Sequence, residues 1–129
     1  MPIHSLGMDL AQIDRIAEVL ERRGERFVAR VFTEAEQAYC DRRSARRAQH
    51  YAGRFAVKES VMKALGTGWA HGVRWRDIEV VRAPGQAPKV ALHGRTAEIA
   101  AQLGIARIHI TITHDAGIAA AVAVAESDG

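Results

Sequence analysis

Apolar residues follow helical spacing through the first half of the chain and alternate, as in strands, through most of the second half. Between about Ala45 and Leu65 they occupy nearly every side of one long predicted helix, which Gly66 ends. A helix that is apolar on nearly all sides is typically central and buried. We therefore expect the rest of the fold to be arranged around this helix.

Two charged residues, Glu59 and Lys63, lie in the middle of one apolar face of this helix, among Phe55, Ala56 and Met62. An ordinary ion pair on a solvated face explains charges at this spacing and stabilises a helix by only about 0.3–0.5 kcal/mol. Burial of a charge, in contrast, is costly unless the charge is paired or bound. Because their neighbours are apolar, we favour a site that needs both charges.

The pattern before the central helix predicts a strand over residues 3–10, a helix over 12–23 that Gly24 ends, and a short helical turn over 25–31. Thr33 and Glu36 have the spacing of a capping box and begin a helix that runs to about Arg43. Capping explains both residues, so we assign them no catalytic role.

The pattern after the central helix is mostly that of strands. Strands are expected over 77–82, 89–93, 107–114 and 118–125, with an amphipathic helix over 94–103. The last strand is apolar on both faces, and such strands are covered on both sides. In a chain of 129 residues, the second cover could be another subunit. We find no linker or internal repeat and expect one domain over residues 1–129.

Composition narrows the class of protein. No apolar run is long enough to span a bilayer, and the N-terminus lacks the basic and apolar segments of a signal peptide. Cys40 is the only cysteine, which excludes an internal disulfide and a cysteine-based zinc site. These features favour a cytoplasmic protein.

The chain is basic, with a net charge of +3 and an isoelectric point near 9.5. Among its 18 basic residues only Lys58, Lys63 and Lys89 are lysines. Arginine suits phosphate binding because its guanidinium is always charged and bidentate, although the bias can also reflect genomic base composition. An aromatic content of 5% argues against a stacking platform for single-stranded nucleic acid.

Arginines recur along the first predicted helices, at Arg15, Arg22, Arg26 and Arg30. They form a basic stripe if the two helical pieces are roughly collinear. Because glutamates are interspersed, the stripe is either an ordinary solvated face or a docking surface for an acidic partner.

Candidate chemistry comes from residues on different elements. Asp9 ends the first strand and is either a helix cap or, with Glu59, an oxygen ligand of a hard cation such as Mg²⁺. Lys63 would then offset phosphate charge. Three glycines within residues 66–72 allow backbone amides to face an anion, but their spacing is not that of a P-loop. His114, at a strand end, is by default a core histidine. Together these residues suggest metal-assisted chemistry on a phosphate or pyrophosphate.

Four motifs occur in an order that is far more specific than any one of them. They are Gly-Met-Asp at 7–9, Phe-Thr-Glu-Ala-Glu at 32–36, Gly-Arg-Phe-Ala-Val-Lys-Glu-Ser-Val-Met-Lys-Ala-Leu-Gly-Thr-Gly at 53–68 and Ile-Thr-His-Asp at 112–115. With them the chain resembles, over essentially its whole length, the holo-[acyl-carrier-protein] synthase family, the short 4′-phosphopantetheinyl transferases. The resemblance implies an α+β fold in which an antiparallel sheet packs on a long central helix, with smaller helices around it.

The resemblance also implies an activity. The phosphopantetheine arm of coenzyme A moves to a serine of apo acyl carrier protein in a Mg²⁺-dependent transfer, which leaves adenosine 3′,5′-bisphosphate. The holo carrier supports fatty acid or polyketide biosynthesis. The family implies a homotrimer with sites between neighbouring subunits, in agreement with the apolar last strand.

Carried over by position, the family's roles fall on residues already described. Asp9 and Glu59 would hold Mg²⁺ against the pyrophosphate of the coenzyme, and Lys63 and His114 would contact its phosphates. Glu59, directly or through a water on the metal, is the candidate base for the serine hydroxyl. The expected catalytic residues are therefore Glu59, Lys63 and His114.

The remaining roles concern the coenzyme and the carrier. Arg54 would lie close to the coenzyme, whose adenosine end would contact Gly66, Thr67 and Gly68. The surface that receives the acidic carrier would include Arg15, Arg22 and Arg26.

Two other classes of protein compete with this interpretation. A non-enzymatic nucleic-acid-binding module accounts for the basic charge but gives no reason for Asp9, Glu59 and Lys63. Another Mg²⁺-dependent enzyme acting on a phosphate or nucleotide would share the site but not the carrier. We expect coenzyme A and acyl carrier protein as partners, and neither nucleic acid nor a membrane.

Overall fold

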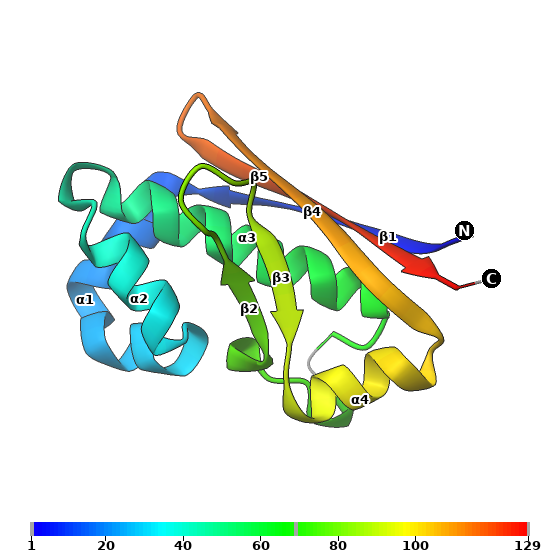
Figure 1. Cartoon of the computed structure of the whole chain (residues 1–129). Coiled ribbons are helices and arrows are strands. Elements are labelled where there is room, and N and C mark those ends of the chain that lie inside the picture. The colour runs from blue at the N-terminus through cyan, green and yellow to red at the C-terminus, as the bar shows by residue number, and fades with distance from the viewer. Residues whose placement is uncertain (1, 69, 129) are drawn as a thin grey trace.

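The computed structural model describes residues 2–68 and 70–128 and is arranged around one long helix, α3 (Arg47–Leu65). Figure 1 shows α3 crossing the molecule with strands laid along it and the other helices around it. Twelve of its residues are buried. In chain order the other helices and strands are β1 (Ile3–Gln12), α1 (Ile13–Val31), α2 (Glu34–Asp41), β2 (Ile78–Val81), β3 (Lys89–Leu92), α4 (Gly94–Gln102), β4 (Ile105–Asp115) and β5 (Ile118–Ser127).

Three strands form an antiparallel sheet in the order β1–β5–β4, and β2 pairs with β3 in a separate antiparallel hairpin. The central strand β5 buries its alternate alanines on the side of α3, namely Ala119, Ala121, Ala123 and Ala125. Small side chains at these positions allow the sheet to lie close to the helix. The predicted fold class, an antiparallel sheet on a long central helix, is confirmed.

Strand β1 lies directly on the backbone of α3. A Cβ added at Gly7 would come within 1.8 Å of the carbonyl oxygen of Ser60, so only glycine fits there. Two hydroxyls fasten the layers: Ser5 Oγ donates to the Ala64 carbonyl at 2.6 Å, and Ser60 Oγ donates to the Ala121 carbonyl at 3.0 Å. This contact places the following residue of the same face, Asp9, over the second half of α3.

On β1 and β5 the other face of the sheet is apolar and lacks a cover within the part of the chain that the structure describes. Leu6, Met8 and Leu10 are 65, 58 and 57% exposed. They pair across the ladder with Val124, Val122 and Ala120 of β5, so the two strands present one continuous apolar surface. Exposed patches of this kind mark interaction surfaces. The sequence predicts that both faces of β5 are covered. Among the described residues, α3 covers one of these faces.

One predicted boundary is confirmed and others differ from the structure. Gly24 separates two helical pieces of α1, as predicted, because its φ of 8° and ψ of −97° are not helical and the chain kinks there. Helix α2 ends at Asp41, and a 3₁₀ turn, Ser44–Arg46, precedes α3. Trp69, within the expected glycine-rich loop, lies outside the described residues. No helix among the described residues has the length and apolar character needed to cross a membrane.

Replacing Gly7 tests the contact between β1 and α3. The methyl group of Gly7→Ala would overlap the Ser60 carbonyl, so the strand must move away from the helix. We expect the free energy of unfolding to fall by about 1–3 kcal/mol, the usual cost of overpacking. Urea denaturation at a fixed protein concentration measures the change. A midpoint equal to that of the unmodified chain would contradict the close contact.

Candidate active site

Two carboxylates from different elements meet where β1 crosses α3. Asp9 comes from the strand and Glu59 from the helix. Burial raises the pKa of Glu59, the nearby Asp9 carboxylate raises it further, and Lys63 opposes both effects. Neighbouring carboxylates repel each other unless a cation lies between or beside them. The pair predicted from sequence is therefore brought together as a site for positive charge.

Lys63 supplies positive charge to this pair. Its Nζ lies 3.0 Å from Asp9 Oδ1 and donates to the Met8 carbonyl at 2.9 Å. The ammonium thus bonds β1 instead of forming the ordinary ion pair with Glu59 on its own helix. The Lys63 side chain is 53% exposed, so the expectation that both charges are buried among apolar residues is wrong for Lys63. The site lies at the surface, where a ligand can reach it.

The acidic pair suits a hard cation that keeps other ligands. Carboxylate oxygens are the preferred protein ligands of Mg²⁺, which is commonly held by one or two of them together with water and substrate phosphates. No group of three or more histidine, cysteine, aspartate or glutamate side chains among the described residues could hold a metal alone. The residues therefore fit a metal whose coordination a substrate completes.

The fully buried charge of α3 is Lys58, which sequence reasoning did not single out. Its Nζ donates to Glu36 Oε1 at 2.8 Å and to the carbonyls of Trp75 and Ile78. Glu36 also accepts the backbone N–H of Val80 at 2.9 Å. One ion pair thus joins the start of α2, the middle of α3 and the start of β2.

Glu36 has a larger role than capping. The capping box with Thr33 is present, as predicted, but the same carboxylate also neutralises Lys58. Because Lys58 and Glu36 are 22 residues apart, local spacing could not pair them. The available signal was the position of Lys58 immediately before Glu59 in the most specific motif.

A pocket of about 790 Å³ near the start of α3 is strongly basic. We call it the arginine pocket. Its basic lining residues come from both halves of the chain, and they are Arg42, Arg43, Arg46, His50 and Arg82. Burial lowers the pKa of His50, and the surrounding guanidinium groups, Arg54 first among them, lower it further. An excess of positive charge of this kind favours an anionic ligand.

Arg54 lies behind this pocket and is 4% exposed. Its guanidinium stacks on the ring of Tyr39, a lining residue, at 4.0 Å from the centroid, and Arg43 contacts the same ring at 3.6 Å. The buried Nε of Arg54 has no hydrogen-bond partner among the described residues. The predicted contact between Arg54 and a coenzyme would therefore lie in the arginine pocket and not at the acidic pair.

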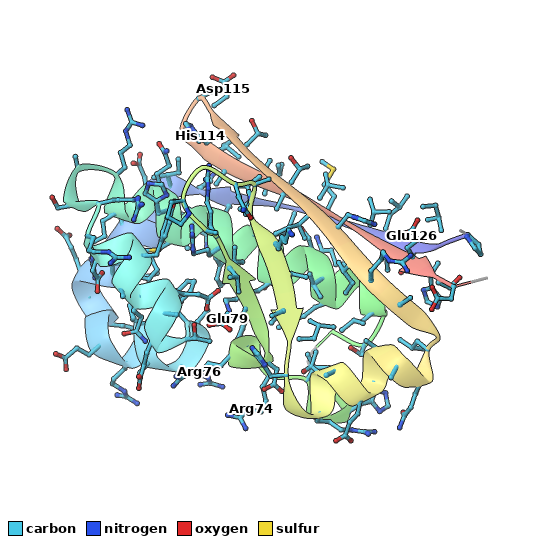
Figure 2. The ribbon with its side chains drawn as sticks, in the orientation of Figure 1. Arg74, Arg76, Glu79, His114, Asp115 and Glu126 are labelled. Atoms are coloured by element: carbon cyan, nitrogen blue, oxygen red, sulfur yellow. The ribbon has the colours of Figure 1, made fainter. Side chains whose placement is uncertain are left out.

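His114 lies at the tip of the β4–β5 hairpin, as Figure 2 shows, and is exposed. The default interpretation as a core histidine is therefore wrong. The Nε2 atoms of His114 and Gln49 are 3.0 Å apart, which places the histidine beside the first turn of α3. Gln49 and Glu59 are separated by ten residues of helix, or about 15 Å at 1.5 Å per residue. Within one chain, His114 is thus not brought to the acidic pair.

The glycine loop after α3 differs from expectation in one respect. Gly66 has a left-handed φ of 76°, and its N–H bonds the carbonyls of Met62 and Lys63 as a helix cap. That amide is therefore not available to an anion. The hydroxyl of Thr67 lies 3.4 Å from the Gly68 carbonyl. The loop follows the C-terminal end of α3, the end opposite His114.

Two adjoining grooves are lined by residues of α1. The first, of about 480 Å³, has a mainly apolar lining that includes Phe27 and Phe55. The second, of about 390 Å³, shares Arg15, Val19 and Phe27 with it and adds Glu18, Arg22 and Arg23. The apolar groove lies near the acidic pair, because Phe55 is one helical turn from Glu59 and Leu10, another lining residue, follows Asp9.

The predicted basic stripe is only partly assembled. Arg15 and Arg22 line these grooves, and Arg22 pairs with Glu18 at 2.8 Å on the exposed surface. Arg26 lies beyond the kink at Gly24 and lines neither groove. The condition for a continuous stripe, collinear helical pieces, is not met.

Known proteins share both the sequence and this fold. Residues 5–123 match the model of the 4′-phosphopantetheinyl transferase superfamily. The chain is 50% identical over 130 residues to the holo-[acyl-carrier-protein] synthase of Anaeromyxobacter sp. (strain K), covering 98% of each chain. Among solved structures, the Neisseria meningitidis holo-[acyl-carrier-protein] synthase has a TM-score of 0.88 at 25% identity, covering 98% of this chain and 100% of that one.

A further solved structure contains a ligand. The Helicobacter pylori holo-[acyl-carrier-protein] synthase, solved in complex with coenzyme A, is 30% identical with a TM-score of 0.81 and covers 94% of this chain and 99% of that one. The family match spans most of the chain, and the motifs carrying Asp9, Glu59 and Lys63 lie inside it. The chain therefore belongs to the 4′-phosphopantetheinyl transferase superfamily.

Proposed function

We propose that this protein transfers the 4′-phosphopantetheine group of coenzyme A to a serine of apo acyl carrier protein. Membership of the superfamily and the likeness to a holo-[acyl-carrier-protein] synthase bound to coenzyme A support the reaction class. The observation that carries the proposal is the acidic pair of Asp9 and Glu59 with Lys63 beside it. An apolar groove lined by Leu10 and Phe55 lies nearby, and arginines line it and the adjoining groove. A diphosphate substrate and an acidic protein substrate both find complementary charge there.

In this reaction the serine oxygen attacks the phosphorus that bears the pantetheine arm. A new P–O bond forms, the phosphoanhydride bond breaks, and adenosine 3′,5′-bisphosphate leaves. Asp9 and Glu59 would hold Mg²⁺, which supplies charge neutralisation for the diphosphate when bound. Glu59 is also our candidate for the base that accepts the serine proton, because its raised pKa makes it a stronger base than an ordinary carboxylate.

The cations of the chain fall into two groups around the substrate. Lys63 would contact the phosphates next to the acidic pair, because its ammonium already lies beside Asp9. Arg54 and His114, with the arginine pocket, would bind phosphates at one end of α3. Thr67 and Gly68, at the opposite end of α3, are further candidates for contact with the adenosine end, and would meet that pocket only across two copies of the chain. Fixed guanidinium groups are suited to phosphate because they donate two parallel hydrogen bonds.

We further propose that one site is built from two copies of the chain in a homotrimer. The separation of about 15 Å along α3 between the level of His114 and that of Glu59 supports this, because both are assigned to one coenzyme. The exposed apolar face of β1 and β5 offers a surface for association. Its composition resembles that of an obligate interface, which is more apolar than the rest of a surface.

The acyl carrier protein would dock along α1. Arg15 and Arg22 line the grooves, and Arg26 extends the basic surface beyond the kink. Charged rims of this kind mainly raise the rate of association and select the partner. The product would serve fatty acid or polyketide biosynthesis, and the cytoplasmic location expected from the sequence stays a prediction.

The transfer reaction can be measured directly by mass. Incubation with coenzyme A, Mg²⁺ and an apo carrier protein should increase the carrier mass by roughly 340 Da, one phosphopantetheine by covalent bookkeeping. Asp9→Asn and Glu59→Gln should each lower the rate by at least about 100-fold, because a lost metal ligand costs more than a lost supporting contact. Circular dichroism confirms that the variants are folded. No mass gain with any fatty-acid or polyketide carrier would refute the proposed reaction, and full activity of both variants would refute the metal assignment.

Charge reversal on α1 tests the docking surface. The double variant Arg15→Glu, Arg22→Glu should weaken carrier binding by about tenfold, equivalent to roughly 1.4 kcal/mol, while leaving coenzyme A binding unchanged. The salt dependence of carrier binding should fall as well, because fewer charges attract the partner. Lys89→Glu on β3 is the control, since it reverses a positive charge outside the grooves. Equal carrier affinity in the double variant and in the control would exclude this surface.

A further inference from the structure

We infer that Lys63 occupies the cation position of the site in the absence of substrate, so that the metal enters together with the diphosphate of the coenzyme. The preferred substrate is then the metal complex of coenzyme A. This inference rests on the proposed function, because it takes Asp9 and Glu59 as the metal ligands. It adds the order in which the metal and the coenzyme bind, which the two carboxylates by themselves do not determine.

The ammonium of Lys63 is already bonded to one of the proposed metal ligands. Its Nζ lies 3.0 Å from Asp9 Oδ1, a normal length for a charge-assisted hydrogen bond, and 2.9 Å from the Met8 carbonyl oxygen. The Asp9 side chain is 17% exposed, so few other directions of approach to its carboxylate remain. A metal that binds Asp9 must therefore displace this ammonium or share the carboxylate with it.

Electrostatics favour displacement over sharing. Lys63 acts on both carboxylates, because it bonds Asp9 and also opposes the rise in the pKa of Glu59. With Lys63 in place, the two carboxylates carry a net charge of about −1 instead of −2, which weakens their attraction for a divalent ion. The metal and the ammonium would also repel each other. The free site should consequently bind a metal weakly.

Coenzyme A can draw Lys63 away from Asp9. The Lys63 side chain is 53% exposed and flexible, so it can turn from Asp9 toward solvent or toward a bound phosphate. A diphosphate next to α3 offers the ammonium new anionic partners and leaves Asp9 free. The same diphosphate supplies oxygen ligands that the pair of carboxylates lacks. Metal and coenzyme should therefore bind cooperatively, and such coupling is reciprocal.

The other lysines help to isolate the effect of Lys63. Lys58 is fully buried on Glu36 and cannot take the place of Lys63. Lys89 is exposed on β3, so removing its charge changes the net charge of the protein equally without touching the site. Lys63→Met keeps most of the length of the side chain and removes the charge, whereas Lys63→Arg keeps a positive charge beside Asp9.

The test uses Mn²⁺ as the probe, with free Mn²⁺ followed by electron paramagnetic resonance, without carrier protein so that no turnover occurs. For the unmodified protein, Mn²⁺ should bind weakly alone and more tightly with saturating coenzyme A. Lys63→Met should bind Mn²⁺ alone about five- to tenfold more tightly than the unmodified protein, near the lower end of usual coupling strengths. Its gain in affinity on adding coenzyme A should shrink. Lys63→Arg and Lys89→Met should bind Mn²⁺ alone as the unmodified protein does.

Two results would overturn the inference, and they have different meanings. If Mn²⁺ binds with coenzyme A but Lys63→Met shows unchanged or weaker affinity for Mn²⁺ alone, Lys63 does not occupy the cation position and the proposed function stands. If Mn²⁺ fails to bind even with coenzyme A, the metal assignment of Asp9 and Glu59 fails and the inference fails with it. Lys63→Gln provides a second neutral variant if Lys63→Met is poorly folded.

Discussion

The close contact between β1 and α3 is the constraint on which the rest of the structure depends. Gly7 allows the strand to lie against the helix backbone, and the hydroxyls of Ser5 and Ser60 fasten it there. Two residues further along β1, Asp9 then reaches the level of Glu59 and Lys63. A larger side chain at Gly7 would separate the carboxylates, since strand and helix could no longer meet. A packing requirement in the core thus sets the distance between the carboxylates of Asp9 and Glu59, on which the proposed chemistry depends.

A second constraint fixes the rotation of α3. The buried pair of Lys58 and Glu36 holds one side of the helix against α2 and the start of β2, while the next residue, Glu59, lies near Asp9 of β1. Buried ion pairs contribute little net stability compared with apolar residues of the same size, but removing one partner leaves an uncompensated charge. In this protein the pair serves to define orientation. Lys58, which is buried and structural, and Glu59, for which we propose a reactive role, are therefore adjacent in the sequence but lie on different sides of α3.

Much of this arrangement could be predicted from the sequence, for reasons that are physical. The apolar character of residues 45–65 predicts a central helix, and alternation predicts the strands, because both patterns report local burial. Glu59 and Lys63 are one turn apart on α3, whereas Asp9 lies on β1, so residue chemistry only suggested linking Asp9 to them and the family motifs made the link specific. The pairing of Lys58 with Glu36 and the arginine pocket depend on contacts between distant segments that local periodicity does not record. For the same reason the position of His114, beside Gln49 rather than Glu59, became visible only in the fold.

The central claim is that one reactive site combines Glu59 of one copy with His114 of another. The most direct measurement mixes two variants, Glu59→Gln and His114→Ala, each inactive alone, as differently tagged chains co-expressed and purified through both tags. Every mixed trimer then contains one site with both native residues. We predict that the doubly purified protein transfers phosphopantetheine, detected as the mass gain of the carrier. Inactivity of verified mixed oligomers would contradict the shared site and would require His114 and Glu59 to act within a single chain.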